Sequence, residues 1–176
     1  MSRVSALVHS QRAIRVVTTE MHGVLKLELS RARLRASDAR TVRKVVSATV
    51  ARHSVHSCVL DASSVLGSDL EELCTAESAT DANPSGLAMR ATAHFQSISN
   101  LCRLLGEAPI PTVTILDGVV SGCALGIGAH ASACVVTERT RLSLPGVAHG
   151  FLPESFATHH LARLPAGLGA YLALTG

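Results

Sequence analysis

Two segments in the second half of the chain hold residue types that could bind a ligand and do chemistry. The first, residues 117–126 (DGVVSGCALG), follows a run of β-branched residues and contains Gly118, Gly122 and Gly126. Glycine lets a backbone approach a ligand, and amide N–H groups at a helix start can hold a phosphate or a developing oxyanion. The spacing matches neither the GxxxxGK[ST] nor the GxGxxG phosphate loop. Close packing of a helix on a sheet would need the same glycines, so the spacing alone leaves both interpretations open.

The second segment, residues 142–154 (LSLPGVAHGFLPE), places one imidazole and one carboxylate in a loop with two prolines. Glu154 stands just before an expected helix and is the candidate general acid or base. A carboxylate at the start of a helix is also favourable by itself, because it faces the positive end of the helix dipole. Both interpretations of Glu154 stay open at this point.

Composition argues against several classes of protein. The 176 residues suffice for one domain with its own core, and 47% hydrophobic and 16% charged residues argue against disorder. The longest apolar region, residues 118–136, is interrupted by polar residues, so no membrane helix is expected. With 2% aromatic residues, base-stacking nucleic-acid modules are disfavoured. The five cysteines form no CxxC pair and no metal-ligand spacing with histidine, so reduced thiols and no metal site are expected.

Charge is distributed unevenly along the chain. Residues 1–60 hold eleven Lys and Arg and three acids, whereas residues 61–176 hold five and ten. A basic front half favours an anionic partner, such as a phosphate-rich ligand, an RNA or an import receptor, with a merely solvated basic face as the alternative. Residues 1–19 contain three Arg, three Ser and no acid, which is typical of mitochondrial transit peptides. We therefore divide the chain into a candidate targeting segment, 1–19, and a domain, 20–176.

The apolar pattern predicts alternating strands and helices. Strands are expected at residues 13–18, 24–29, 57–61, 112–116, 134–137 and 141–144. Helices are expected at residues 37–53, 85–105, 118–131, 155–163 and 167–175. Loops are expected at residues 62–84 and 145–153. Strands that alternate with helices predict an α/β fold with right-handed crossovers.

At the two segments the sequence resembles the crotonase superfamily (enoyl-CoA hydratase/isomerase), and more closely its 3-hydroxyisobutyryl-CoA hydrolase branch. Residues 111–118 (PTVTILDG), followed by Gly122, Gly126 and His130, are similar to that branch's HGxxMGGGVGLSxHG stretch. Three further stretches are similar to MPExxIGLFPDVGG, LxRLxGxLGxxLALTG and, more weakly, AGGDI: residues 144–157, 161–176 and 66–70. The likeness covers residues 22–176 in the order that the family shows.

The resemblance implies both a fold and a chemistry. The fold would be a spiral of ββα units with sheets packed crosswise, and the family's C-terminal helical part would be missing. The chemistry would be binding or hydrolysis of a short-chain acyl-CoA thioester, as in valine catabolism, with coenzyme A as part of the substrate and no other cofactor. By position, the oxyanion hole would be the backbone N–H groups of Leu66 and Cys123, and the catalytic carboxylate would be Glu154. The substrate site would be lined by Gly67, Gly122, Gly126 and Gly146.

The sequence departs from the family at the carboxylates. The family's Pro-Glu is Pro145-Gly146 here, its Pro-Asp is Pro153-Glu154, and residues 85–105 contain no acid where one is expected. Losing a positioned acid or base typically lowers a rate by about 10²–10⁴-fold. Two hypotheses result: an acyl-CoA hydrolase of the mitochondrial matrix, or an inactive member that serves as a structural or interaction subunit, for example of a mitochondrial ribosome. A protein partner or a second copy is expected to cover the face that the missing half would occupy, RNA is a further candidate partner, and no membrane association is expected.

Overall fold

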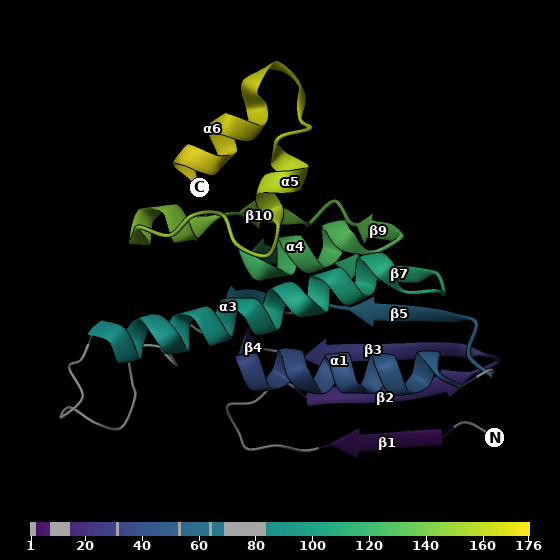
Figure 1. Ribbon diagram of the computed structural model, residues 1–176. Coiled ribbons are helices and arrows are strands. Elements are labelled where there is room, and N and C mark those ends of the chain that lie inside the picture. Colours follow the sequence, from purple (N-terminus) through teal and green to yellow (C-terminus); the bar gives the residue numbers. More distant parts are fainter. Residues whose placement is uncertain (1–2, 8–14, 31, 53, 64, 69–83) are drawn as a thin grey trace.

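Four successive ββα units make up most of the chain (Figure 1). The computed structural model describes all residues except 1–2, 8–14, 31, 53, 64 and 69–83. In each unit, a strand of one long sheet is followed by a short strand of a second layer and then by a helix. The units are β3-β4-α1, β5-β6-α3, β7-β8-α4 and β9-β10-α5. This arrangement confirms the predicted α/β spiral of ββα units.

The long sheet has six strands in the spatial order β1-β2-β3-β5-β7-β9. The first three strands pair antiparallel, and His22 and Gly23, both with positive φ, form the two-residue turn between β2 and β3. The last four pair in parallel, as expected where helices cross over between strands. The strands are β1 (Arg3–Leu7), β2 (Arg15–Met21), β3 (Val24–Ser30), β5 (Ser57–Asp61), β7 (Thr112–Leu116) and β9 (Ala133–Val136).

The second layer consists of two pairs of short parallel strands, β4 with β6 and β8 with β10. Their bounds are β4 (Ala32–Leu34), β6 (Val65–Ser68), β8 (Val119–Ser121) and β10 (Arg141–Ser143). β6 also lies against β8. The two pairs therefore bring together segments from all four units.

Helices α1 and α3 lie side by side over the long sheet, and α4 lies beside α3 (Figure 1). α5 and α6 continue away from the sheet beyond α4, and the exposed side chains of α6 include Tyr171 and Leu174. The expectation that a partner covers such a face stays a prediction. The helices are α1 (Ala36–Val50), α3 (Pro84–Glu107), α4 (Cys123–His130), η1 (Pro145–His149), α5 (Ala157–Leu161), η2 (Pro165–Gly167) and α6 (Leu168–Thr175).

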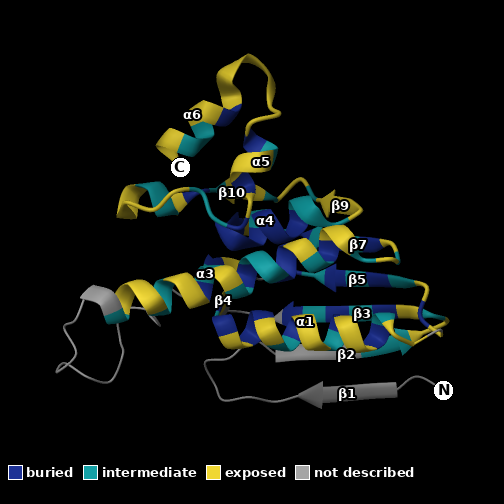
Figure 2. Cartoon of the chain, viewed as in Figure 1, coloured by how far each residue is buried: buried dark blue, intermediate teal, exposed yellow. Residues whose placement is uncertain are grey.

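A large core fills the space between the sheet and the helices (Figure 2). In β5 and β7 alternate residues point inward, so that Leu60 and Leu116 are buried while their neighbours are less so. From the helices, Val42, Val46 and Ile98 complete the packing with no exposed surface. Each such side chain contributes about 1.5–3 kcal/mol when fully buried. The core therefore holds the short strands and α4 at fixed positions.

Three short strands differ from the sequence expectations. Residues 119–121 were expected to be helical and instead form β8, so the predicted helix begins only at Cys123. β6 falls in the segment expected as a loop, and β4 was not expected. Strands of three or four residues, with Gly67 inside one and Gly122 directly after another, are too short to show an alternating pattern.

The candidate targeting segment, residues 1–19, includes β1 and part of β2. β1 pairs with β2 from Arg3 to Leu7, and residues 8–14 lie outside the described part of the chain. The division of the chain at residue 19 therefore stays a prediction. Among the described residues, no helix combines the length and the apolar character that crossing a bilayer requires.

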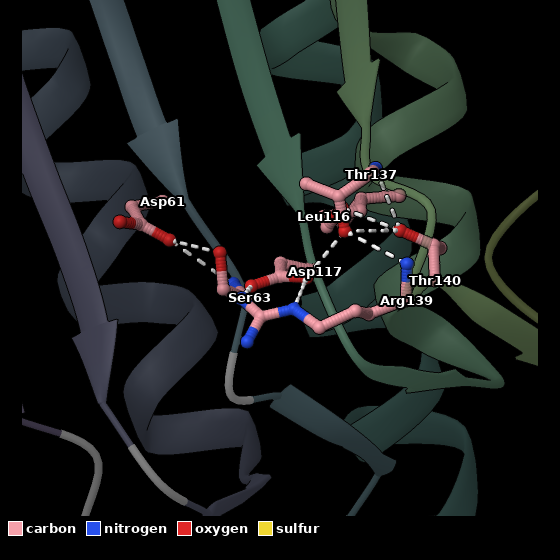
Figure 3. Close-up of polar contacts among 7 residues, drawn as sticks. All are labelled: Asp61, Ser63, Leu116, Asp117, Thr137, Arg139 and Thr140. Atoms are coloured by element: carbon pink, nitrogen blue, oxygen red, sulfur yellow. Dashed lines mark hydrogen bonds and ion pairs between the residues drawn. The ribbon is translucent and has the colours of Figure 1, made fainter.

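A polar network fastens the end of β7 to the loop between β9 and β10 (Figure 3). Asp117 accepts hydrogen bonds from the guanidinium of Arg139, with Nε at 3.2 Å, and from the hydroxyl of Thr137. The hydroxyl of Thr140 donates to the Leu116 carbonyl at 2.9 Å. Gly118, the residue after Asp117, has φ +77° and turns the chain into β8. The network therefore fixes where the glycine-containing segment begins.

This network should make stability depend on pH through Asp117. The Thr137 hydrogen bond, followed by those from Arg139, lowers the pKa of Asp117 below its ordinary value of 3.8. A carboxylate with a lowered folded-state pKa stabilises the fold above its unfolded pKa, and this stabilisation is lost as pH falls through the folded value. We expect Asp117→Asn to lower the melting temperature at pH 7, and the difference from wild type to shrink as the pH falls below about 4.

Thermal denaturation followed by circular dichroism at several pH values measures this difference. Glu138→Gln is the matched control, because Glu138 is an exposed acid of the same loop. A melting-temperature difference for Asp117→Asn that is as large at about pH 2 as at pH 7 would contradict the assignment.

Candidate functional site

A cavity of about 530 Å³ opens between the short strands β6 and β8 and the segment that includes η1 and the turn before α5. Five residues that the sequence analysis selected line it: Leu66, Gly67, Gly122, Gly146 and Glu154. They come from three segments that are far apart in sequence. The fold thus brings the predicted glycines and the predicted carboxylate to one place.

Two glycines allow the close approaches that shape this cavity. Gly67 has φ +111°, and a Cβ there would lie 3.1 Å from the Ser121 carbonyl oxygen, so β6 can lie directly against β8. Gly122 has φ +50°, and a Cβ there would lie 2.8 Å from Oε1 of Glu154. The Glu154 carboxylate therefore lies on the bare backbone at the start of α4.

The Glu154 carboxylate is held by neutral donors in a half-buried position. The Ser68 hydroxyl lies 2.9 Å from Oε1 and 2.8 Å from Oε2, so it donates to the carboxylate in a forked arrangement. Burial raises the pKa of Glu154 above its ordinary 4.5, and hydrogen bonding from Ser68 and from the Cys123 backbone N–H opposes this rise. A raised pKa brings a carboxylate closer to neutral pH, where it can exchange protons as an acid or base.

The Cys123 backbone, rather than its side chain, is the chemically useful part of this residue. Cys123 is the first residue of α4, so its N–H has no acceptor within the helix. The preceding N–H, of Gly122, donates to the Ser143 carbonyl at 3.0 Å and is thereby occupied. The Cys123 thiol is fully buried, and this burial raises its pKa well above 9.0, so it is an uncharged thiol and not a nucleophile.

Gly126 lies outside the cavity lining, and its immediate contact is with the turn that carries Glu154. A Cβ at Gly126 would lie 2.4 Å from both Cβ and the carbonyl oxygen of Ser155. This glycine therefore allows the turn to sit directly on α4. The expectation that Gly126 contacts substrate stays a prediction, as do the donor roles of Leu66 and Cys123.

A histidine cluster holds α5 on α4 beside this turn. His130 at the end of α4 has Nδ1 2.8 Å from the Gly126 carbonyl oxygen and 3.3 Å from Nε2 of His160. The ring of Phe156 lies against the His130 ring, with centroids 5.5 Å apart. Within the described part of the chain, no group of three or more His, Cys, Asp or Glu could hold a metal ion. These histidines thus act in packing.

Four polar residues line the cavity that were not predicted as site residues: Arg33, Ser68, Ser121 and His149. Ser68 is the middle residue of the LGSDL stretch, where the resembling AGGDI motif has glycine, and this substitution was the available signal. Arg33 belongs to the basic front half, but nothing in its neighbours singled it out. Arg33 and His149 bring positive or ionisable groups to the cavity wall, which suits an anionic ligand.

The architecture and the cavity together define an α/β protein with a cavity beside a backbone turn and one carboxylate. A family model described as enoyl-CoA hydratase/isomerase matches residues 24–176. The chain belongs to this family.

Curated relatives match shorter stretches. The small ribosomal subunit protein mS47 of Arabidopsis thaliana is 42% identical over 82 residues, which are 47% of this chain and 20% of that protein. The mitochondrial 3-hydroxyisobutyryl-CoA hydrolase of Xenopus tropicalis is 35% identical over 97 residues, which are 55% of this chain and 25% of that protein. The matched stretches thus span between a fifth and a quarter of these relatives' lengths.

Solved structures match almost the whole chain. A carnitinyl-CoA dehydratase from Mycobacterium thermoresistibile superimposes with a TM-score of 0.79 at 28% identity, over 92% of this chain and 48% of that one. An enoyl-CoA hydratase from Rhodobacter sphaeroides has a TM-score of 0.80 at 23% identity, again over 92% and 48%. The chain therefore spans about half the length of these structures, and the second likeness shows the fold alone.

The packing of Gly126 predicts a measurable loss of stability on substitution. Gly126→Ala places a methyl group against backbone atoms of Ser155, so α4 and the turn must separate, and we expect unfolding free energy to fall by about 1–3 kcal/mol. Urea denaturation measures this change. Gly86→Ala is the control, because a Cβ there meets only the end of the Arg90 side chain at 3.7 Å. If Gly126→Ala unfolds at the same urea concentration as wild type, the packing role is wrong.

Proposed function

We propose that this chain binds a short-chain acyl-CoA thioester in the cavity at Glu154 and hydrolyses it in the mitochondrial matrix. The observation that carries the proposal is the half-buried Glu154 carboxylate in the cavity wall, beside the N–H of Cys123. Membership of the enoyl-CoA hydratase/isomerase family supports an acyl-CoA ligand. Relatives named as mitochondrial 3-hydroxyisobutyryl-CoA hydrolases support the acyl group and the location.

In the proposed reaction, water attacks the thioester carbonyl carbon and gives up a proton to Glu154. The carbonyl electrons move to the oxygen, which the backbone N–H groups of Leu66 and Cys123 stabilise as an oxyanion. The oxyanion then re-forms the carbonyl, the carbon–sulfur bond breaks, and Glu154 returns the proton to the coenzyme A thiolate. One carboxylate thus serves as base and then as acid, because Gly146 stands where the resembling branch has a second carboxylate.

Hydrolysis of 3-hydroxyisobutyryl-CoA, followed by release of free thiol, tests this proposal. We expect turnover by wild type, and a fall of about 10²-fold or more for Glu154→Gln because the amide cannot exchange the proton. Glu138→Gln is the control, since Glu138 lies on the exposed loop before β10. The hydrolase proposal fails if purified wild type releases no thiol, or if Glu154→Gln keeps full activity.

A second candidate function is that of an interaction subunit bound to RNA, for example in a mitochondrial ribosome. One face of α1 favours it: Arg40, Arg43 and Lys44 are exposed at helical spacing, while the helix's single acid, Asp38, is buried. Two relatives named as small ribosomal subunit protein mS47, from Arabidopsis thaliana and Neurospora crassa, support the same candidate. Exposed cations along one helix suit the phosphates of an RNA strand, which attract them without any need for aromatic stacking.

This candidate predicts that RNA binding depends on the α1 cations and on salt. The double variant Arg43→Gln/Lys44→Gln removes two phosphate contacts, so the slope of log affinity against log salt should fall in magnitude by about 1.4 for single-stranded RNA. Fluorescence anisotropy with a labelled single-stranded RNA between about 50 and 200 mM KCl measures this slope. The control, Arg141→Gln/Arg163→Gln, removes the same charge elsewhere. Equal slopes for the two double variants would rule out α1 as the RNA contact.

A further inference from the structure

The geometry points to a self-occupied site: in the unliganded protein, the Glu154 carboxylate takes the hydrogen-bond donors that a ligand's carbonyl oxygen needs, and the ligand must displace it. Ser68 supplies one of these donors through its hydroxyl, which adds to the backbone N–H groups of Leu66 and Cys123 in the proposed oxyanion hole, and the Cys123 N–H also lies beside the Glu154 carboxylate. The inference rests on the proposed function, because it concerns the same donors and the same carboxylate. It adds a resting state in which this carboxylate competes with the ligand.

The contacts of Glu154 define the occupied position. Both carboxylate oxygens lie within 2.9 Å of the Ser68 hydroxyl oxygen, and the Cys123 backbone N–H at the start of α4 lowers the pKa of the same carboxyl. Oε1 lies so close to Gly122 that a Cβ there would be 2.8 Å away. A carboxylate and a thioester oxyanion prefer the same donors, and a single backbone N–H cannot serve both in full. The carboxylate therefore stands where the carbonyl oxygen would bind.

The contact is also of a kind that a ligand can displace. A carboxylate in a half-buried wall needs donors to offset its lost hydration. Among the described residues, the Ser68 hydroxyl donates to Glu154, the Cys123 amide that lowers the pKa of this carboxyl is likewise neutral, and no ion pair holds it. Hydrogen bonds between a charged and a neutral group are worth about 1.5–3 kcal/mol, less than a buried ion pair would cost to break. Binding of a ligand can therefore expel the carboxylate into the open cavity.

Ser68 gives this site a donor that the resemblance does not provide. The resembling AGGDI turn has glycine where this chain has Ser68, so the hydroxyl is an addition of this sequence. It lines the same cavity as Gly67 and Gly122. Once Glu154 moves away, the hydroxyl is free to donate to the ligand's carbonyl oxygen. Ser68 thus has two successive partners, first the resting carboxylate and then the ligand.

Two non-hydrolysable analogues of butyryl-CoA test the inference by calorimetry. In 2-oxopentyl-CoA a methylene separates the sulfur from a ketone carbonyl, and in butyl-CoA there is no carbonyl. We expect Glu154→Ala to bind 2-oxopentyl-CoA about tenfold more tightly than wild type. The ligand's carbonyl oxygen then no longer has to displace the carboxylate from its hydrogen bond, which is worth about that much. Butyl-CoA should bind the two proteins equally. Glu138→Ala, which removes an exposed acid away from the cavity, should change neither affinity.

Further variants distinguish two effects of Glu154: occupation of the hydrogen-bond donors by its side chain, and its negative charge. Glu154→Gln keeps a side chain whose amide oxygen can accept the same hydrogen bonds, so it should bind 2-oxopentyl-CoA less tightly than Glu154→Ala. Ser68→Ala in the Glu154→Ala background should remove part of the gain, since the ligand loses one donor. Glu154→Asp, with a shorter arm, should show a gain in the same direction as Glu154→Ala and serves if the alanine variant does not fold.

Equal affinity of wild type and Glu154→Ala for 2-oxopentyl-CoA would overturn the inference, as would an equal gain for butyl-CoA. These outcomes are distinct from failure of the proposed hydrolysis. If the wild type is active but the variants gain no affinity, the hydrolase proposal stands and the self-occupied site is wrong. If the wild type is inactive but the variants gain affinity for 2-oxopentyl-CoA as expected, the self-occupied site stands and the hydrolase proposal is wrong.

Discussion

The hydrogen bond between the Ser68 hydroxyl and the Glu154 carboxylate joins two residues that are 86 positions apart in the chain. It holds the turn before α5 against β6, and the cavity lies between these two segments. A half-buried carboxylate without donors would cost several kcal/mol, and the Ser68 hydroxyl offsets part of this cost. The shape of the site and the protonation of its carboxylate therefore depend on the same contact.

The turn that carries Glu154 is held in a strained conformation. Ser155 and Phe156 both have φ near +60°, which costs a non-glycine residue about 1–2 kcal/mol each. By the resemblance, the family has glycine where this chain has Phe156. The strain persists because the turn is fixed on both sides, by Gly126 beneath Ser155 and by Ser68 on Glu154. Close packing on Gly126 of α4 and the hydrogen bond from Ser68 thus hold this strained turn in place.

The sequence predicts the long sheet better than the second layer, because only the long strands show their pattern within their own residues. β5 and β7 show their alternating burial directly in residues 57–61 and 112–116, so both strands were predicted with their observed bounds. β6 and β8 are short, and they exist because pairing with β4 and β10 supplies hydrogen bonds that no local pattern encodes. The site follows the same rule. Its glycines and Glu154 were found through motifs, whereas the role of Ser68 depends on a distant contact.

The same fold can keep its stability whether or not it keeps a reaction. The core consists mainly of aliphatic side chains from the sheet, α1, α3 and α4. Of the three residues with a proposed catalytic role, only Cys123 has its side chain in this core, and its proposed role belongs to the backbone N–H. Gly146, where the resembling branch has a carboxylate, brings no charge to the cavity wall, so it carries no desolvation cost. The cations of α1 lie on the solvent side of a helix whose inner face packs on the core. The proposed catalytic cavity and the proposed interaction face of α1 are therefore separate surfaces. A substitution in one of them need not disturb the other.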